Sequence, residues 1–468
     1  MKRFSALLFV LLLVSFSHAQ QKWWRTYGGT SGEEGYSVRQ TTDGSYIVAG
    51  WTNSYGAGFD DVYLIKTNAS GDTLWTRSYG GTYYETAWSV KQTFDGGYII
   101  GGYASSFPVG AWDVYLIKTN ASGDTLWQRT YGGDSYDYGY SVCQTADTGY
   151  IIVGETDSYG AGGGDVYLIK TNASGDTLWT RSYGGTVDEA GWSVQQTQDR
   201  GYIIAGYTSS FGAGGGDVYL IKTNASGDTL WTKTYGGTNP DSGFSVQQTS
   251  DGGFIIAGAT SSFGAGGFDV YLVKTDSLGH SLWTKTYGGT ADDFGRFVQQ
   301  TADGGYIIAG TTYSYGAGYS DVYLIKTNAA GDTLWTKTYG GTDFDYGFSV
   351  QQTSDGGYII SGGTWSYGAG YTDVYLIKTD ANGTVGVADN GSSRLTPYAS
   401  RLTISPNPFA SFASVPGHSS ERFALYDISG RKAGTCLGNR IGEGLAAGVY
   451  FLRSEGRHTK PLRIVKLR

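Results

Sequence analysis

Two sets of acids and one set of aromatic residues recur about every 52 residues along most of this 468-residue chain. The first acid stands five residues before a recurring valine, at Glu33, Glu85, Asp137, Glu189, Asp241, Asp293 and Asp345. The second opens the recurring segment D-V-Y-L, at Asp61, Asp113, Asp165, Asp217, Asp269, Asp321 and Asp373. The aromatic residue follows a serine in a glycine-rich segment, at Tyr55, Phe107, Tyr159, Phe211, Phe263, Tyr315 and Tyr367. Carboxylates accept hydrogen bonds from sugar hydroxyls and attract cations, and aromatic rings stack on the C–H faces of sugars. The residue types therefore suit a ring that binds sugars, cations or a basic partner.

Both acid sets also have a structural interpretation, in which each carboxylate hydrogen-bonds the backbone of its own loop. We favour that interpretation for the second set, because Asp61 and its equivalents adjoin the glycine-rich loop. The first set stays Asp or Glu while its neighbours vary. We therefore keep the first set, together with the aromatic residues, as candidate ligand-binding residues.

Short strands must position these residues. In one copy, apolar-rich runs occupy residues 191–197, 201–208, 217–223 and 229–236, which we name strands A, B, C and D. Their Val, Ile, Tyr, Trp and Thr content is typical of strands, and the turns between them are rich in Gly and Asp. Seven such units predict an all-β chain that forms a seven-bladed β-propeller, and a right-handed β-helix is the alternative. In an antiparallel blade the D–A and B–C loops share one face, so that face should hold both acid sets.

The ends of the repeat region indicate how the ring closes. A Trp marks strand D of each copy, at Trp24, Trp75, Trp127, Trp179, Trp231, Trp283 and Trp335, and we expect it to be structural. The first interval is one residue shorter than the others, which indicates a residue missing from the first D–A loop. The chain begins the repeats with a lone D strand and leaves after the seventh C strand, so the first strand should complete the last blade. Whether the blades group as A-B-C-D or C-D-A-B stays open, although resemblance to other propellers favours A innermost.

Two further repeated positions favour structural roles. A third acid lies in the A–B turn and resembles the Asp-box turn of other propellers, at Asp43, Asp95, Asp147, Asp199, Asp251, Asp303 and Asp355. Strand C carries a lysine, at Lys66, Lys118, Lys170, Lys222, Lys274, Lys326 and Lys378. A lysine buried between blades needs an acidic partner, so we expect it to pair with one of the Asp sets. The turn that joins Gly175 to Trp179 resembles the Gly-x-x-x-Trp docking motif of quinoprotein propellers, which typically have eight blades.

Catalysis and metal binding find little support in the repeats. The only histidine there, His280, stands in a turn, which excludes a His-based triad or metal site. No D-x-D-x-D-G calcium loop or phosphate loop is present, so we expect no cofactor, with calcium possible but unsupported by a motif. Enzymes usually break symmetry at the active site, and these copies hardly differ. Cys143 stands where other copies hold Arg39, Lys91 or Gln195, which we interpret as an incidental substitution.

Charge and the first residues bear on location and partners. Residues 20–386 hold 36 acids and 19 bases, which argues against nucleic acid and anionic membrane as partners. Residues 1–19 read as a signal peptide, with Lys2 and Arg3 before an apolar run and a small-residue cleavage site at 17–19. No transmembrane segment is expected. The two cysteines lie in different regions, which excludes a disulfide framework. We predict an exported protein, monomeric, and secreted or attached to the outer surface.

Residues 387–400 are predicted to be a linker, and residues 401–468 a separate short β domain with 11 bases and 4 acids. This domain resembles the type A C-terminal sorting domain of type IX secretion substrates. The matching positions are Asn407, Pro408, Tyr426, Asp427, Gly430, Arg431, Gly448, Tyr450 and Lys466. The resemblance implies a small Ig-like β-sandwich that the secretion machinery recognises at the outer membrane.

These observations predict a non-catalytic binding or adhesion propeller at the cell surface. Its expected ligand is an extracellular glycan or protein, met by the face that carries the D–A and B–C loops. One alternative is a secreted enzyme of glycosidase or quinoprotein-dehydrogenase type, since paired acids suffice for glycoside hydrolysis. A passive component of the surface coat is the other.

Overall fold

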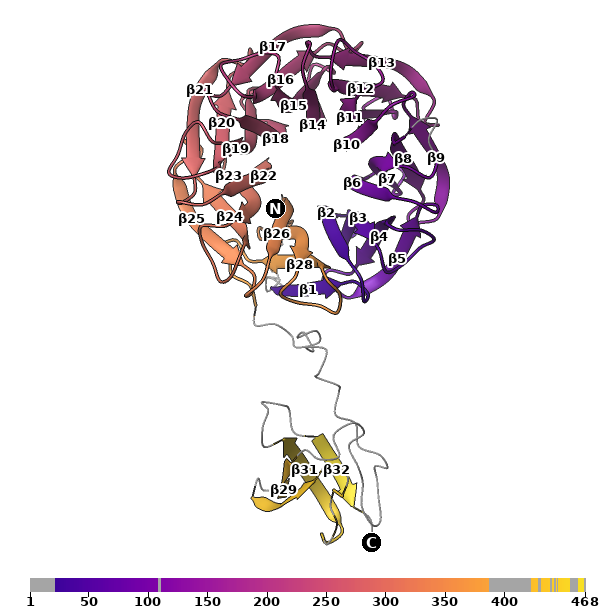
Figure 1. Cartoon of the computed structure of the whole chain (residues 1–468), viewed down its shortest axis with the longest axis vertical. Coiled ribbons are helices and arrows are strands. Elements are labelled where there is room, and N and C mark those ends of the chain that lie inside the picture. The colour runs from indigo at the N-terminus through magenta and orange to yellow at the C-terminus, as the bar shows by residue number, and fades with distance from the viewer. Residues whose placement is uncertain are drawn as a thin grey trace, which may run out of the picture. The chain divides into compact units, whose positions relative to one another are not determined.

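The computed structural model describes residues 22–107 and 111–386, and in the C-terminal region residues 422–427, 431–437, 440–441, 443, 445–454 and 462–466. The chain divides into two compact units, Met1–Arg394 and Leu395–Arg468. The described part of the first unit folds into seven four-stranded antiparallel sheets around a ring (Figure 1). This is a β-propeller, and each sheet is a blade. The predicted signal peptide, residues 1–19, and the predicted linker, residues 387–400, lie outside the described residues.

Each blade runs in the order A-B-C-D, with strand A toward the centre of the ring in Figure 1. The A strands are β2 (Glu33–Gln40), β6 (Glu85–Gln92), β10 (Asp137–Gln144), β14 (Glu189–Gln196), β18 (Asp241–Gln248), β22 (Asp293–Gln300) and β26 (Asp345–Gln352). The B strands are β3 (Tyr46–Thr52), β7 (Tyr98–Ala104), β11 (Tyr150–Thr156), β15 (Tyr202–Thr208), β19 (Phe254–Thr260), β23 (Tyr306–Thr312) and β27 (Tyr358–Thr364). The C strands are β4 (Asp61–Thr67), β8 (Asp113–Thr119), β12 (Asp165–Thr171), β16 (Asp217–Thr223), β20 (Asp269–Thr275), β24 (Asp321–Thr327) and β28 (Asp373–Thr379). The D strands are β5 (Thr73–Tyr79), β9 (Thr125–Tyr131), β13 (Thr177–Tyr183), β17 (Thr229–Tyr235), β21 (Ser281–Tyr287), β25 (Thr333–Tyr339) and β1 (Trp23–Tyr27).

The hydrophobic core lies between neighbouring blades. Every residue of the C strand β4 is buried, whereas the outer strand β5 alternates between exposed and partly covered residues. Leu64 and Ile47 of the first blade pack in one cluster with Val90 and Ile100 of the second. Strands that carry apolar residues on both faces are expected where each sheet is covered on both sides. This packing repeats around the ring and holds the A strands at its centre.

Strand β1 closes the ring, as predicted, by pairing antiparallel with β28. The register corrects the expected repeat: Trp23 lies opposite Lys378, just as Trp75 lies opposite Lys66, so Trp23 is the equivalent of Trp75. The interval from Trp23 is therefore about 52 residues like the others, and no residue is missing from the first D–A loop. Trp24, predicted to hold this position, instead packs against Tyr367 with tilted rings whose centroids lie 4.8 Å apart.

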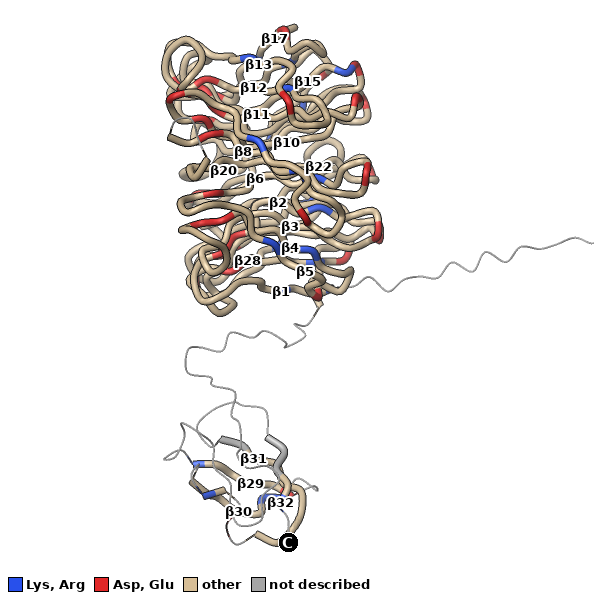
Figure 2. Tube along the Cα trace, turned by 90° about the vertical axis from the view of Figure 1, so that its right-hand side faces the viewer, with Lys and Arg blue, Asp and Glu red and all other residues tan. Residues whose placement is uncertain are grey.

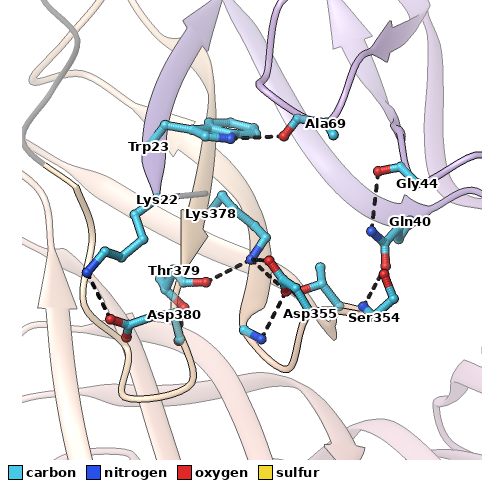
Figure 3. A network of polar contacts seen from close by, with 12 residues as sticks. Lys22, Trp23, Gln40, Gly44, Ala69, Ser354, Asp355, Lys378, Thr379 and Asp380 are labelled. Carbon is cyan, nitrogen blue, oxygen red and sulfur yellow. Dashed lines mark hydrogen bonds and ion pairs between the residues drawn. The ribbon is translucent and has the colours of Figure 1, made fainter. Parts of the chain in front are cut away.

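Polar contacts also hold β1 in place at the closing seam, where the last blade meets the first (Figure 3). The indole nitrogen of Trp23 donates to the carbonyl of Ala69 in the first blade at 3.1 Å. The Lys22 ammonium forms an ion pair with Asp380 at 3.0 Å. The seam is thus fixed by strand pairing, an aromatic side chain and a charge pair.

The strand-C lysines pair with the acids of the A–B turns, which confirms that prediction. Lys66 contacts Asp43 at 3.2 Å, and the other six pairs have N–O distances of 2.8 to 3.0 Å. The side chain of Lys66 is buried and that of Asp43 is exposed. Burial opposes ionisation of Asp43, but hydrogen bonds from Thr41 and Ser45 and the Lys66 charge together lower its pKa to about 2. Five of these turns place a glycine at positive φ, while Thr148 and Arg200 occupy that conformation in the other two.

The described part of the C-terminal unit is one antiparallel sheet in the order β30-β29-β31-β32. Its strands are β29 (Arg422–Asp427), β30 (Lys432–Leu437), β31 (Gly448–Ser454) and β32 (Leu462–Lys466). Phe423, Leu425 and Leu452 form its buried centre with Ile441.

Six of the nine positions that resemble a sorting domain are described, and they fall within this sheet or beside it. Tyr426 and Asp427 end β29, Arg431 precedes β30, Gly448 and Tyr450 lie in β31, and Lys466 ends β32. Asn407, Pro408 and Gly430 lie outside the described residues. A second sheet, which an Ig-like sandwich requires, stays a prediction.

Candidate functional site

The D–A and B–C loops lie together on one rim of the ring, which we call the loop rim. The D–A loop that enters one blade pairs with the B–C loop of the blade before it, as in the parallel bridge between Asp60 and Tyr84. The backbone nitrogen of Glu85 donates to the carbonyl of Asp60 at 2.7 Å in the same contact. Figure 2, which views the ring edge-on, shows Asp and Glu positions gathered along both rims.

The first acid set lies beneath the loop rim rather than on its surface. The exposed fraction of these residues is at most 1%. One carboxylate oxygen of Glu33 accepts from the nitrogen of Gly29 at 2.8 Å, and the other accepts from the Thr52 hydroxyl at 2.8 Å and the Ser54 nitrogen at 3.0 Å. Such acids fasten the D–A loop to the B–C loop of the same blade. In this structure a ligand could contact them only by displacing those loops, and this holds for Glu33, Glu85, Asp137, Glu189, Asp241, Asp293 and Asp345.

The second acid set bonds the glycine-rich loop, as the structural interpretation requires. The Asp61 carboxylate accepts from the backbone nitrogens of Ala57 and Gly58 at 3.0 and 3.2 Å. Asp165, Asp217, Asp269, Asp321 and Asp373 accept the same hydrogen bond from the glycine-rich loop of their own blade. Asp113 occupies the same position in β8 and is also buried.

One acid of each set meets the other across every blade interface, and we call these the interblade acid pairs. A Cβ added to Gly80 would lie 2.1 Å from an Asp61 oxygen and 2.4 Å from a Glu85 oxygen, so both carboxylates flank the same point. Burial, with a further contribution from Asp345, raises the pKa of Asp321 to about 6. Calcium usually takes six to eight oxygen ligands. Among the described residues no group of three or more His, Cys, Asp or Glu side chains could hold a metal ion.

The predicted aromatic residues do reach the surface of the loop rim. Six of them have exposed fractions of 42 to 47%, at Tyr55, Phe107, Tyr159, Phe211, Phe263 and Tyr315, and Tyr367 is less exposed. Each leans on the tyrosine of strand C, as in the contact between Tyr55 and Tyr63 with centroids 5.7 Å apart. The Tyr55 hydroxyl also donates to the carbonyl of Gly28 at 3.0 Å, which fixes the ring in place.

Sequence reasoning missed a second group of aromatic residues on the same rim. They come from loop positions that vary between copies, and we call them the aromatic crown: Phe59, Tyr84, Trp112, Tyr136, Tyr319, Phe344, Trp365 and Tyr371. Tyr319 and Tyr371 are the most exposed, at 65% and 73%. Phe59 stacks on Tyr84 at 5.0 Å, and Tyr319 on Phe344 at 4.8 Å. The crown is interrupted where the B–C loops of the third and fourth blades hold glycines, at 162–164 and 214–216. The sequence signal that could have identified the crown is that these loop positions vary while the rest of the repeat is nearly uniform.

A cavity of about 880 Å³ occupies the centre of the ring. Its walls come from the A strands of all seven blades. One layer lies two residues before the strand-A valine, at Tyr36, Trp88, Tyr140, Trp192, Phe244, Arg296 and Phe348. Another lies one residue after it, at Arg39, Lys91, Cys143, Gln195, Gln247, Gln299 and Gln351. No Asp or Glu is among its described lining residues. The seven copies therefore differ at positions that face one another across the cavity.

Comparison with known proteins supports the fold. A family described as a β-propeller domain of unknown function, DUF5122, matches residues 41–73. The chain is 28% identical over 181 residues to the regulatory protein FlaEY of Caulobacter vibrioides, a match that covers 33% of this chain and 19% of that protein. The chain thus spans about a fifth of the length of this curated relative.

Similar solved structures are distant. One is PorZ of Porphyromonas gingivalis, a bacterial surface component of the type IX secretion system, with 11% identity, a TM-score of 0.43, and coverage of 94% of this chain and 60% of PorZ. Another is the extracellular domain of BT4673 from B. thetaiotaomicron, with 10% identity, a TM-score of 0.43, and coverage of 96% of this chain and 59% of that chain. Across the part of the chain that the structure describes, no helix is long and apolar enough to span a membrane. The family match and the sheet topology together identify a β-propeller.

Proposed function

We propose that this chain is an exported, seven-bladed β-propeller that acts as a non-catalytic binding module for an extracellular glycan or protein. The aromatic crown on the loop rim is the contact surface. The observation that carries the proposal is the exposure of large rings such as Tyr319 and Tyr371 on a single rim. Large apolar side chains that are exposed together on one face are typical of binding sites. Stacked rings also suit the C–H faces of sugars.

The crown has the rigidity that a binding surface needs. Its loops are fastened from below by the first acid set, and neighbouring rings support one another, as Phe59 does Tyr84. A ligand therefore meets side chains that lose little conformational freedom on binding. The predicted aromatic residues of the B–C loops, such as Tyr55, add further exposed rings to the same rim.

The enzyme alternative is less well supported by the geometry. The interblade acid pairs are covered by loops and occur at every interface, whereas a glycosidase uses two accessible carboxylates at one site. The quinoprotein alternative is supported only by the resemblance of the turn that ends at Trp179, and none of the residues at the loop rim adds to it. A passive coat component would make no use of the crown.

A binding screen with matched variants tests the proposal. The full chain is applied to arrays of glycans and of extracellular proteins, with and without Ca²⁺, and compared with Tyr319→Ala/Tyr371→Ala. We expect the crown variant to bind at least about tenfold more weakly. The control is Leu74→Ala/Leu126→Ala, which removes side chains of similar exposure from the outer D strands. Hydrolysis of a polysaccharide by a chain that binds none of the arrayed molecules would sink the proposal.

We also propose that the C-terminal unit directs transfer across the outer membrane by a type IX secretion system. The support is the resemblance at Tyr426, Gly448 and Lys466 and the basic charge of this region. Removal of residues 462–468, which include β32, should leave the protein in the periplasm of a host that has this system. Surface display of the shortened chain at the normal level would contradict this assignment.

A further inference from the structure

The central cavity holds positively charged side chains that form no ion pair within the described part of the chain. Arg39 and Lys91 occupy the same strand position in neighbouring blades, where blades four to seven hold glutamine. Arg296 replaces an aromatic residue in the layer above. A neutral glutamine fits this slot four times in the same ring, so the cations are not required for packing.

These cations have no carboxylate partner among the described residues. The Arg39 guanidinium donates to the carbonyl of Val38 at 2.6 Å and to the Ser349 hydroxyl at 3.1 Å, and it lies 4.8 Å from the ring centroid of Phe297. We find no hydrogen bond or ion pair from Lys91 to the rest of the described chain. Arg296 lies over Phe244 and Phe294, 4.5 and 5.0 Å from the ring centroids, and its Nε is buried without a partner.

The strand-C lysines differ from Arg39 and Lys91, which are half-buried, because they are buried and paired with acids. Each strand-C lysine, such as Lys66, reaches an aspartate within 3.2 Å. A charge held in the interior without a partner costs free energy, and this chain has acids in excess. Glu34 and Glu155 lie at the loop-rim ends of β2 and β11 and are not among the lining residues of the cavity. The cavity is therefore a positive site within an acidic domain.

The protonation behaviour agrees with this geometry. Burial, and then the nearby Arg39 charge, lowers the pKa of Lys91 to about 7. Burial also lowers the pKa of Arg39 to about 10. Burial is the main cause of both shifts, and a bound anion would favour the charged forms.

We propose that the central cavity binds a small organic anion whose carboxylate or sulfate group lies between Arg39 and Lys91. The other layer of the cavity presents rings such as Trp88 and Tyr140, which would contact a sugar or other ring of the ligand. A volume of about 880 Å³ is within the usual range for a small-molecule site. This site is separate from the aromatic crown and goes beyond the proposed function.

The test compares the full chain with Arg39→Gln/Lys91→Gln, which installs the residue that four other blades already carry. The matched control is Arg77→Gln/Lys285→Gln, which removes the same charge from two half-exposed positions on D strands. The probes are digalacturonate, a neutral galactose disaccharide and inorganic sulfate, titrated by calorimetry at constant ionic strength. We expect digalacturonate to bind the wild type more tightly than the neutral sugar does, and the cavity variant to bind it about 30-fold or more weakly. Sulfate should compete with digalacturonate.

Melting temperatures, measured with and without sulfate, test whether the cavity variant is folded and whether it has lost the anion site. Without ligand the cavity variant should melt at or above the wild-type temperature, because it loses unpaired charge. Sulfate should raise the melting temperature of the wild type and of the control, but not of the cavity variant. Equal sulfate stabilisation of wild type and cavity variant would overturn the anion site. If sulfate binds but digalacturonate binds no more tightly than the neutral disaccharide, the proposal that the ligand is an organic anion is overturned. Crown variants should bind these probes like the wild type, which separates failure here from failure of the proposed function.

Discussion

The substitution Trp23→Ala should loosen the closing strand while leaving the other blades intact. Trp23 is 5% exposed, lies edge-on to Tyr46 at 5.9 Å and donates to the carbonyl of Ala69. Truncating a buried tryptophan costs about 3–5 kcal/mol, of which about 1 kcal/mol belongs to the hydrogen bond. Trp23 also shares a core cluster with Val374 and Leu376 of β28, so its loss should weaken the packing of β1 on the last blade as well as on the first.

Native-state hydrogen exchange measures this directly. The amides of Val374–Lys378 that bond to β1 should open about 100- to 3,000-fold more often, since about 1.4 kcal/mol corresponds to a factor of ten. The control is Trp75→Ala, the equivalent change in the first blade, where strand D follows strand C through a tight turn. Trp75 is also only half-buried, so the loss of protection in β4 should be smaller. Wild-type protection of β28 in the Trp23 variant, or an equal effect of Trp75→Ala in β4, would refute the reasoning about closure.

Three further predictions concern stability. Gly80→Ala should destabilise the domain by about 1–3 kcal/mol in chemical denaturation, because the new Cβ falls between the two carboxylates of an interblade acid pair. Thr148→Gly and Arg200→Gly should each raise stability by about 1 kcal/mol, since both residues hold positive φ that glycine adopts freely; no gain in melting temperature would contradict this. The pKa of Asp321 is raised above its unfolded value, so its ionisation opposes folding and the melting temperature should rise as pH falls from 7 to 5. Asp321→Asn should flatten that slope, and an unchanged slope would assign the effect elsewhere.

Repetition made much of the fold predictable. Strand lengths, turn positions and the offset of the first D strand follow from a pattern seen seven times, and the pairing of Lys66 with Asp43 follows from the cost of a buried charge. The register of β1 did not follow, because Trp23 and Trp24 are adjacent and the pattern fits either one. Only the pairing of Trp23 with Lys378 decides between them.

The site was harder to predict, because a repeated acid looks the same whether it faces a ligand or its own loop. Glu33 persists as an acid because three groups of the surrounding loops donate to it, and burial cannot be read from spacing. The cavity was missed for a different reason. Arg39 and Lys91 stand about 52 residues apart in sequence and become neighbours only when the blades pack. In the sequence, each residue looks like an isolated exception within its own repeat, although in the folded ring both line the same side of the cavity.

The closure of the ring by its first strand has a consequence for how the chain folds. Lys22 and Asp380 are in contact although they lie 358 positions apart in the sequence. During synthesis β1 therefore emerges before every other strand of the propeller, and its partner β28 emerges after all the others. Meanwhile all seven C strands share the segment D-V-Y-L, and any copy whose edge is open offers β1 a nearly equivalent partner. Refolding should therefore be slow and dependent on concentration, because β1 of one molecule can pair with β28 of another. Strand-exchanged dimers are the expected by-product when the protein is refolded at high concentration.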